Sequence, residues 1–294
     1  MNEPIAALAT AKKGAYKERL RPSEKRALWS SRIIIWVAII IEMFPVYWIL
    51  LASFSPGDAF FTGTLLPGKL STENYVKVLQ DTDFLIWVKN SMILCTGVSI
   101  IQLFLTTTAA YAFSRMKFKG KKYGLMTLLI LQMFPTIMAI PAIYGILAKL
   151  NWLDNIYALM LVLAGGNAFN IWLLKGYIDS LPYELDEAAK VDGATHWQIF
   201  IKIILPLIVP MLVVIFLFSF IGVYSEFAIT SIVIHDPKSY TVALGLQRFI
   251  VNQFSAHWTQ FAAAAVMASL PITVVFMLLQ RYLQAGFAAG AVKG

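Results

Sequence analysis

Long apolar segments alternate with short polar ones along this chain of 294 residues. Each apolar segment approaches the roughly 20 residues that a helix needs to cross the hydrocarbon core of a bilayer. The pattern predicts an all-α integral membrane protein whose six spans form one domain over residues 33–283. A basic arm, residues 1–32, precedes this domain, and a short tail, residues 284–294, follows it. The expected spans are residues 33–54, 88–113, 123–148, 156–177, 207–229 and 259–283.

Composition and charge agree with a membrane protein. Hydrophobic residues make up 59% of the chain and charged residues only 14%, against about 25% charged residues in soluble domains. A net charge of +8 could by itself indicate nucleic-acid binding, but the distribution of the charge argues against that partner. With both termini in the cytoplasm, most of the 24 Lys and Arg residues fall inside, as the positive-inside rule requires. The six in outer segments are Lys69, Lys77, Lys89, Lys149, Lys238 and Arg248.

Aromatic residues mark the predicted outer ends of the spans. Trp48, Trp87, Trp152 and Trp258 fall at these ends, where an aromatic belt is expected. Together with the charge distribution, they predict a multi-pass membrane protein with both termini in the cytoplasm.

The segment between the fourth and fifth spans, residues 178–206, is amphipathic and is called the coupling loop below. Pro182 suits the first turn of a helix, and the acidic residues that follow it complement the positive helix N-terminus. Leu185, Ala188 and Ala189 share one narrow face at i, i+3 and i+4. Asp192-Gly193 ends this helix, because glycine tolerates the positive φ of a helix end.

A second short helix is expected after that glycine. Thr195 and Gln198 have the spacing of a capping box. Pro206 and Pro210 then predict a stop or a kink where the fifth span begins. The apolar side of this helix consists of Trp197, Phe200, Ile201 and Ile204.

The coupling loop also carries a family signature. Glu187-Ala188-Ala189, three residues, Gly193, nine residues, Ile203, one residue and Leu205-Pro206 resemble the EAA motif of bacterial ABC importer membrane subunits. YAFSRMKF at 111–118, LQMFP at 131–135, the alanine-rich run at 262–273 and the closing GAVKG resemble the second permease subunit of maltose/maltodextrin-type importers. The likeness spans nearly the whole chain from Ile33 onward.

The resemblance implies a type I ABC importer permease that lies in a bacterial cytoplasmic (inner) membrane as part of a larger complex. The partners would be a second permease subunit, two copies of a cytoplasmic ATPase and an extracytoplasmic solute-binding protein, all assembled in membrane lipid. Bound ATP and magnesium would belong to the ATPase, with no cofactor on this chain. The residues implied to contact the ATPase are Glu187, Ala188, Ala189, Asp192, Gly193, Trp197, Leu205 and Pro206. Those implied to face the binding protein lie in the outer loop, residues 233–258: Asp236, Tyr240, Gly245, Gln247 and Gln253.

The sequence offers no constellation that predicts catalysis. The pairs Gly68-Lys69 and Gly120-Lys121 are followed by Leu and Lys, so neither completes a P-loop. The three histidines, at 196, 235 and 257, lack zinc-ligand spacing. We therefore expect a non-catalytic membrane subunit.

Polar and helix-loosening residues within the spans are candidates for a translocation pathway. Acids in a membrane are costly and mark a pathway or a proton relay by default, although both Glu42 and Glu226 could instead reach water or a neighbouring hydroxyl. The alternative functions are therefore an ion-coupled secondary transporter that acts without an ATPase, and a membrane-embedded enzyme or scaffold. The candidate pathway residues are Gln132, Pro135, Asn167, Tyr224 and Glu226.

Overall fold

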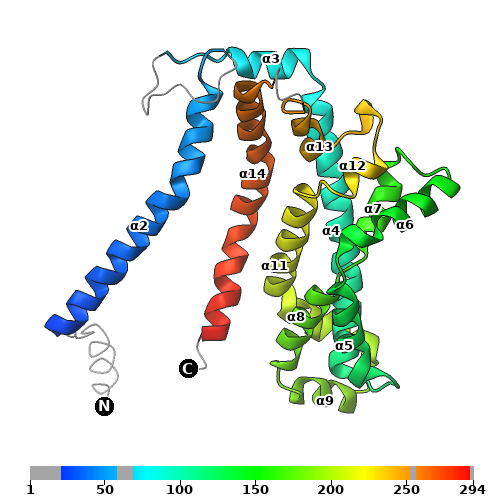
Figure 1. Ribbon diagram of the computed structural model, residues 1–294. Coiled ribbons are helices and arrows are strands. Elements are labelled where there is room, and N and C mark those ends of the chain that lie inside the picture. The colour runs from blue at the N-terminus through cyan, green and yellow to red at the C-terminus, as the bar shows by residue number, and fades with distance from the viewer. Residues whose placement is uncertain (1–20, 58–68, 252–255, 292–294) are drawn as a thin grey trace, which may run out of the picture. The chain divides into compact units, whose positions relative to one another are not determined.

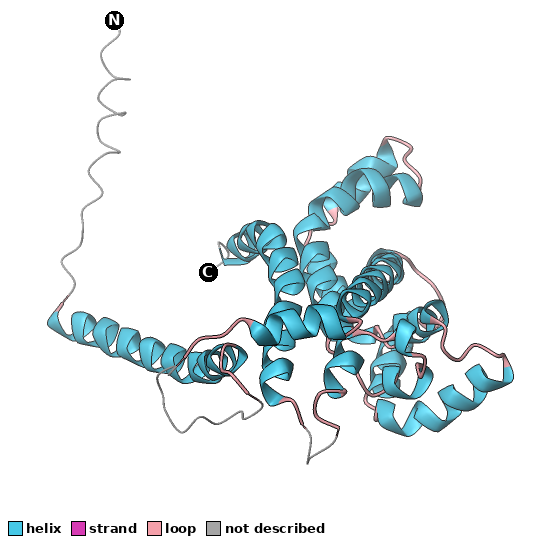
Figure 2. Ribbon diagram, turned by 90° about the horizontal axis from the view of Figure 1, so that it is seen from above, coloured by secondary structure: helices cyan, strands magenta, loops and turns pink. Residues whose placement is uncertain are grey.

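A computed structural model describes the backbone of residues 21–57, 69–251 and 256–291, with side chains to residue 282. Every regular element in these ranges is a helix (Figure 2), which confirms the all-α prediction for the described chain. The predictions for residues 1–20, for Gln253 and for the end of the tail at 292–294 lie outside the described residues.

The chain divides into two units, Met1–Ile49 and Leu50–Gly294. The described part of the first unit belongs to α2 (Pro22–Ser53), which contains nearly all of the predicted first span. Glu24 accepts a hydrogen bond from the backbone N–H of Arg21 at 2.7 Å and so satisfies a free donor at the helix start. The last turn of α2 belongs to the second unit.

The second unit is organised around one long helix, α4 (Phe84–Arg115), against which several of the other helices pack (Figure 1). Its buried side chains follow one another at i+4, as in Leu94, Val98, Gln102, Thr106 and Ala110. Small and polar side chains at such a helix interface allow close packing within a membrane.

Three apolar clusters lie at successive levels of α4. The first involves Phe84 and Trp87 and includes α3 (Glu73–Asp81), α13 (Val242–Gln247) and α14 (Trp258–Ala291). The second, at Leu94 and Val98, includes α6 (Thr136–Lys149), α7 (Ile156–Ala164) and α12 (Thr230–Val233). The third, at Ala110 and Tyr111, includes α5, α8, α9, α10, the π-helix η2 and α11. Their bounds are Lys121–Gln132, Ala168–Asp179, Glu184–Val191, His196–Ile199, Phe200–Ile204 and Leu205–Tyr224.

Two of the predicted spans are broken rather than continuous. Helices α5 and α6 meet at an angle of 89°, and α7 and α8 at 50°. Pro135 and the pair Gly165-Gly166 lie at these breaks, as their helix-loosening chemistry predicts, whereas Pro141 lies inside α6. Four described helices are long and apolar enough to cross a membrane, or six if each bent pair is one span.

Of the two outcomes that the sequence predicts at Pro206, a stop or a kink, the stop is wrong. Residues His196–Tyr224 form one helical run of 29 residues, with a π-helical turn directly before the proline. In that turn the N–H of Leu205 bonds to the carbonyl of Phe200, five residues back. A wider turn makes room for the pyrrolidine ring, which would clash with the carbonyl of a regular α-turn. The second half of the coupling loop is therefore a direct extension of α11.

Trp87 is not a belt residue, because only 2% of it is exposed. Its ring packs against Gly245, where an added Cβ would approach the indole to 2.2 Å. Glycine at 245 is thus required by close packing, and this contact buries the indole between α4 and α13.

Candidate functional site

The coupling loop lies at the end of α4 opposite to α3 (Figure 1). Helix α9 carries acidic side chains in its first turn, where they complement the helix dipole. Gly193 follows with φ +79° and turns the chain toward α10. The capping box predicted at Thr195 and Gln198 is present, with Gln198 Oε1 accepting from the Thr195 N–H at 2.7 Å.

The three residues that were predicted to share one narrow face of α9 differ in exposure. Leu185 and Ala188 are exposed, whereas Ala189 is buried and packs into the cluster at the end of α4. The face turned toward α4 consists of Asp186 and Ala189, an i, i+3 pair. Ala189 is thus a packing residue of this chain and is closed to another protein.

The outward surface of the loop combines charge with apolar side chains. Glu187, Asp192 and Gly193 are exposed, and so are the large side chains of Val191 and Trp197. Leu205 and Pro206 are the last two of the residues implied to contact an ATPase. Pro206 is exposed and Leu205 is half-buried. An apolar patch with a polar rim is typical of a protein-docking surface.

An ion pair between α4 and α9 was not predicted from the sequence. The Arg115 Nε and Asp186 Oδ2 atoms lie 3.1 Å apart, with 2% and 3% of the side chains exposed. These atoms are not aligned for a hydrogen bond, so charge attraction dominates the contact. The guanidinium also donates from Nη2 to the Leu181 carbonyl at 2.9 Å and lies 4.0 Å from the centre of the Tyr183 ring. Arg115 thus fixes α9 on α4.

A second connection lies beside this ion pair. Asp179, at the end of α8, accepts hydrogen bonds from Ser114 at 2.6 Å and from Lys175. Partial burial opposes ionisation of Asp179, but these two hydrogen bonds and the nearby positive charges prevail and lower its pKa. Asp179 is therefore ionised at neutral pH and ties α8 to the end of α4.

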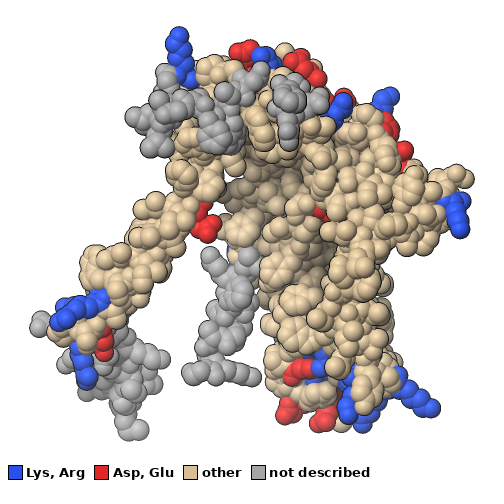
Figure 3. Space-filling view, viewed as in Figure 1, with Lys and Arg blue, Asp and Glu red and all other residues tan. Residues whose placement is uncertain are grey.

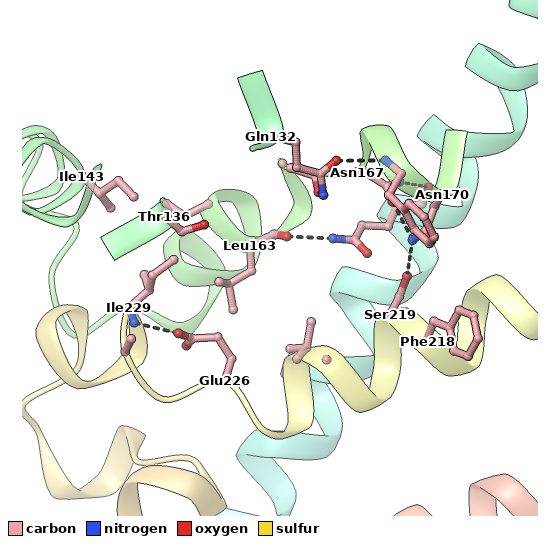
Figure 4. Close-up of a pocket in the computed structure, with 18 of the residues that line it drawn as sticks. Gln132, Thr136, Ile143, Leu163, Asn167, Asn170, Phe218, Ser219, Glu226 and Ile229 are labelled. Atoms are coloured by element: carbon pink, nitrogen blue, oxygen red, sulfur yellow. Dashed lines mark hydrogen bonds between the residues drawn. The ribbon is translucent and has the colours of Figure 1, made fainter. Parts of the chain in front are cut away.

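Three of the five candidate pathway residues line one cavity, of about 630 Å³, between the broken spans and α11. These are Gln132, Asn167 and Glu226, and Figure 4 shows them around the same space. Pro135 and Tyr224 are not part of its lining. The Tyr224 hydroxyl instead donates to the Ala268 carbonyl at 2.6 Å and joins α11 to α14.

Side-chain amides at the cavity satisfy the backbone groups that the helix breaks expose. Gln132 donates to the Gly166 carbonyl at 2.7 Å and accepts from the Phe169 N–H at 2.9 Å. Gln102, which the sequence did not single out, donates to the Leu163 carbonyl at 2.9 Å. A helix break inside a membrane needs such partners, because the hydrocarbon core offers none.

Asn167 and Glu226 also have structural partners. The amide of Asn167 donates to the Gln102 carbonyl and to Thr106 on α4. Glu226 accepts from the N–H of Ile229 at 2.7 Å and of Thr230 at 3.0 Å, and so caps the short helix α12. In this conformation both carboxylate oxygens of Glu226 are engaged at the start of α12.

The outer-loop residues that were predicted to face a binding protein differ in exposure. Asp236 and Gln247 are exposed, Tyr240 is half-buried, and Gly245 is buried against Trp87. Gly245 therefore cannot touch a docked protein in this conformation. Asp236 accepts from the Lys238 N–H at 3.2 Å and shapes the exposed turn.

Asp154, in the turn before α7, anchors the outer loop. Its carboxylate accepts from the backbone N–H groups of His235 and, at 2.8 Å, Asp236. Slight burial opposes ionisation, but these bonds and the His235 charge lower the pKa of Asp154 below its ordinary value of 3.8. A lowered pKa means that the attachment is complete above pH 3.8 and weakens as pH falls through the lowered value.

We therefore expect an Asp154→Ala variant to lose this attachment at neutral pH. The backbone N–H groups of His235 and Asp236 should exchange with solvent faster than in the unchanged chain at pH 7. Acidification through the lowered pKa of Asp154 should produce the same loss in the unchanged chain, once intrinsic exchange rates are subtracted. Asp83→Ala is the control, because Asp83 makes no side-chain cap bond. Equal protection in both variants would contradict the anchoring role.

Comparison with known proteins gives a consistent result. The family described as "Binding-protein-dependent transport system inner membrane component" matches residues 102–288. The maltose/maltodextrin transport system permease protein MalG of Vibrio vulnificus (strain YJ016) is 40% identical, over 92% of this chain and 98% of the relative. MalG of Escherichia coli (strain K12) is 38% identical over the same shares.

A solved structure supports the fold. A chain of a bacterial ABC transporter involved in the import of the acidic polysaccharide alginate superimposes with a TM-score of 0.74. The alignment covers 90% of this chain and 98% of that one, at 22% sequence identity.

Proposed function

Because this chain belongs to the family of inner membrane components of binding-protein-dependent transport systems, we propose that it is a permease subunit of an ATP-driven sugar importer. The substrate class is maltose or maltodextrin, on the strength of the 40% identical relative. The observation that carries the proposal is the surface of the coupling loop, where Glu187 and Val191 are exposed on α9, which is fixed to the end of α4, and Trp197 is exposed on α10. Such a surface suits docking of a separate ATPase subunit.

The proposed topology has six spans, with the two bent pairs counted as one span each and both termini in the cytoplasm. The coupling loop then lies inside and the outer loop outside. This chain would form half of the pathway, a second permease subunit the other half, and two ATPase copies would bind and hydrolyse ATP with magnesium. An extracytoplasmic binding protein would deliver sugar to the outer face at the exposed residues Asp236 and Gln247.

The proposed mechanism follows from how α9 is attached. The Arg115–Asp186 pair joins α9 to α4, and the continuous run His196–Tyr224 joins the loop to α11. When the ATPase subunits close on ATP, movement of the docked loop would pass to both helices at once. The cavity lined by Gln132, Asn167 and Glu226 lies farther along these helices, on the proposed sugar pathway.

Purification of the tagged chain from its membrane in mild detergent tests the assignment. We expect a P-loop ATPase and a second permease to co-purify, and sugar uptake into proteoliposomes to require both ATP and that ATPase. The rival hypothesis, an ion-coupled secondary transporter, requires uptake by this chain alone. Recovery of the chain alone, with uptake that needs only an ion gradient, would overturn the proposal.

A Gly193→Val variant should uncouple ATP hydrolysis from uptake. Nothing lies within 4 Å of a Cβ at this position, so the expected cost is backbone strain at φ +79°, about 1–2 kcal/mol. Gly193→Asn is the matched control, because asparagine tolerates this conformation. We expect uptake per ATP hydrolysed to fall severalfold in the valine variant and to stay near normal in the asparagine variant. Normal coupling in both would remove Gly193 from the mechanism.

A further inference from the structure

A second cavity, of about 420 Å³, lies between α5 and α8, away from the proposed sugar pathway. The two helices pack against each other and leave a groove with two kinds of wall. Amines gather at one end, from Lys121 and Lys122 in the first turn of α5 and from Lys175 on α8. The other walls are apolar: Leu125, Met126, Leu129 and Trp172.

The end of the groove where the amines gather has an excess of positive charge. Its lining contains three lysines and no acid. Among the described residues, Lys175 pairs with Asp179, whereas Lys121 donates to a neutral partner, the Ser114 carbonyl, at 2.8 Å. The Lys122 amine lies 5.4 Å from the centre of the Tyr123 ring. Figure 3 shows basic side chains over the start of α5, with the acidic ones gathered beside them over α9.

The apolar walls continue from the amines along the helix. Lys121, Leu125 and Leu129 follow one another at i+4 and therefore share one face of α5. Met126 and Trp172 remain 60% and 50% exposed at the mouth of the groove. A surface that is cationic at its cytoplasmic end and hydrocarbon beyond it is complementary to an amphiphile that stands along the helices.

We propose that this groove binds an anionic glycerophospholipid of the cytoplasmic leaflet, with its phosphate at Lys121, Lys122 and Lys175 and an acyl chain along Leu125, Met126 and Trp172. Basic pockets between spans on the cytoplasmic side suit such headgroups. A zwitterionic lipid would bring its own ammonium group to the lysines. Free phosphate would leave the apolar walls uncovered. This inference depends on the proposed membrane orientation and is independent of the transported sugar.

The test uses the chain in its purified assembly, placed in nanodiscs with equal amounts of phosphatidylglycerol and phosphatidylethanolamine. Native mass spectrometry then measures which lipid is retained after partial delipidation. We expect phosphatidylglycerol to be enriched, and Lys122→Gln to reduce the enrichment about fivefold, the effect of one lysine near a lipid surface. Lys149→Gln is the matched control, because it removes the same charge at an exposed site at the far end of α6.

A second variant tests the apolar part without changing charge. Met126→Trp fills the mouth of the groove and should reduce retention of both lipids, with the thermal midpoint of the assembly unchanged. Equal enrichment in Lys122→Gln and Lys149→Gln would overturn the proposal. So would enrichment that emerges only after ATPase subunits are stripped away, because the groove would then be a protein interface. Lipid retention does not require transport, so failure here and failure of the sugar assignment are separate results.

Discussion

An Asp186→Asn variant is expected to detach α9 from α4 and to reduce sugar uptake at least tenfold while the chain still inserts into the membrane. The change leaves the Arg115 guanidinium buried without its counter-charge. Removal of one partner of a buried ion pair costs about 3–5 kcal/mol, because the remaining charge stays desolvated. The lost attachment is the one through which α9 would move α4.

The measurement is hydrogen exchange across Glu184–Val191, together with uptake by the reconstituted assembly. We expect α9 to lose its protection in Asp186→Asn and to keep it in Glu184→Gln, the same chemical change at an exposed position of the same helix. Equal protection in these two variants would show that the ion pair does not anchor α9.

A double variant tests whether the protection of α9 is lost because a charge is left unpaired or because the side chains no longer pack. Replacement of a whole buried pair by apolar side chains is often neutral, because no charge is left desolvated. Arg115→Met with Asp186→Leu should therefore restore much of the protection that Asp186→Asn loses. If the double variant has as little protection as the single one, the hydrogen bond from Arg115 to Leu181 and the contact with Tyr183 are needed in addition to the ion pair.

The features that the sequence predicted correctly are local ones. The elbow at Gly193 and the capping box of Thr195 and Gln198 each depend on residues within one helical turn. The helical class follows from apolar runs long enough to cross a membrane, a property of each segment by itself. The positions of the breaks near Pro135 and Gly165 also follow from residue type.

The contacts between helices that give the site its geometry could not be predicted from such local patterns. Arg115 meets Asp186 and Gln132 meets Gly166 across different helices, and periodicity within one helix does not specify a partner on another. The sequence pattern groups Ala189 with Leu185 and Ala188, whereas in the structure Ala189 is buried together with Asp186. An i, i+3 pair of Asp186 and Ala189 beside a basic helix end was the available signal for the correct face.

The continuity through Pro206 has a different cause. Proline breaks a regular α-helix by its missing N–H and its ring, and the sequence was interpreted by that rule. The π-helical turn at Phe200–Ile204 removes the clash by widening the helix just before the proline. Because this turn has no strong residue signature, only the structure could show that the loop and α11 are one element.

A Gln132→Met variant is expected to loosen both broken spans at once. The methionine keeps the length of the side chain but can neither donate to the Gly166 carbonyl nor accept from the Phe169 N–H. Interhelical hydrogen bonds in membranes contribute about 0.6 kcal/mol each on average and up to about 1.7. The two bonds together therefore stabilise the junction by about 1–3 kcal/mol, enough to change the population of an alternative arrangement about tenfold.

Spin labels at Ile146 on α6 and Gly176 on α8, both exposed, would report this change as a broader distance distribution. Gln132→Glu should give a distribution of intermediate width, between those of the unchanged chain and Gln132→Met. A carboxylate still accepts from the Phe169 N–H but cannot donate to the Gly166 carbonyl. Thr136→Val is the control, since it removes a polar group from the same cavity without touching either bond. If Gln132→Met and Thr136→Val give the same distances and the same uptake, the amide at position 132 merely lines the cavity. If only Gln132→Met broadens the distances and lowers uptake, one side chain holds the two helix breaks in register, and the outer halves α6 and α7 turn about it.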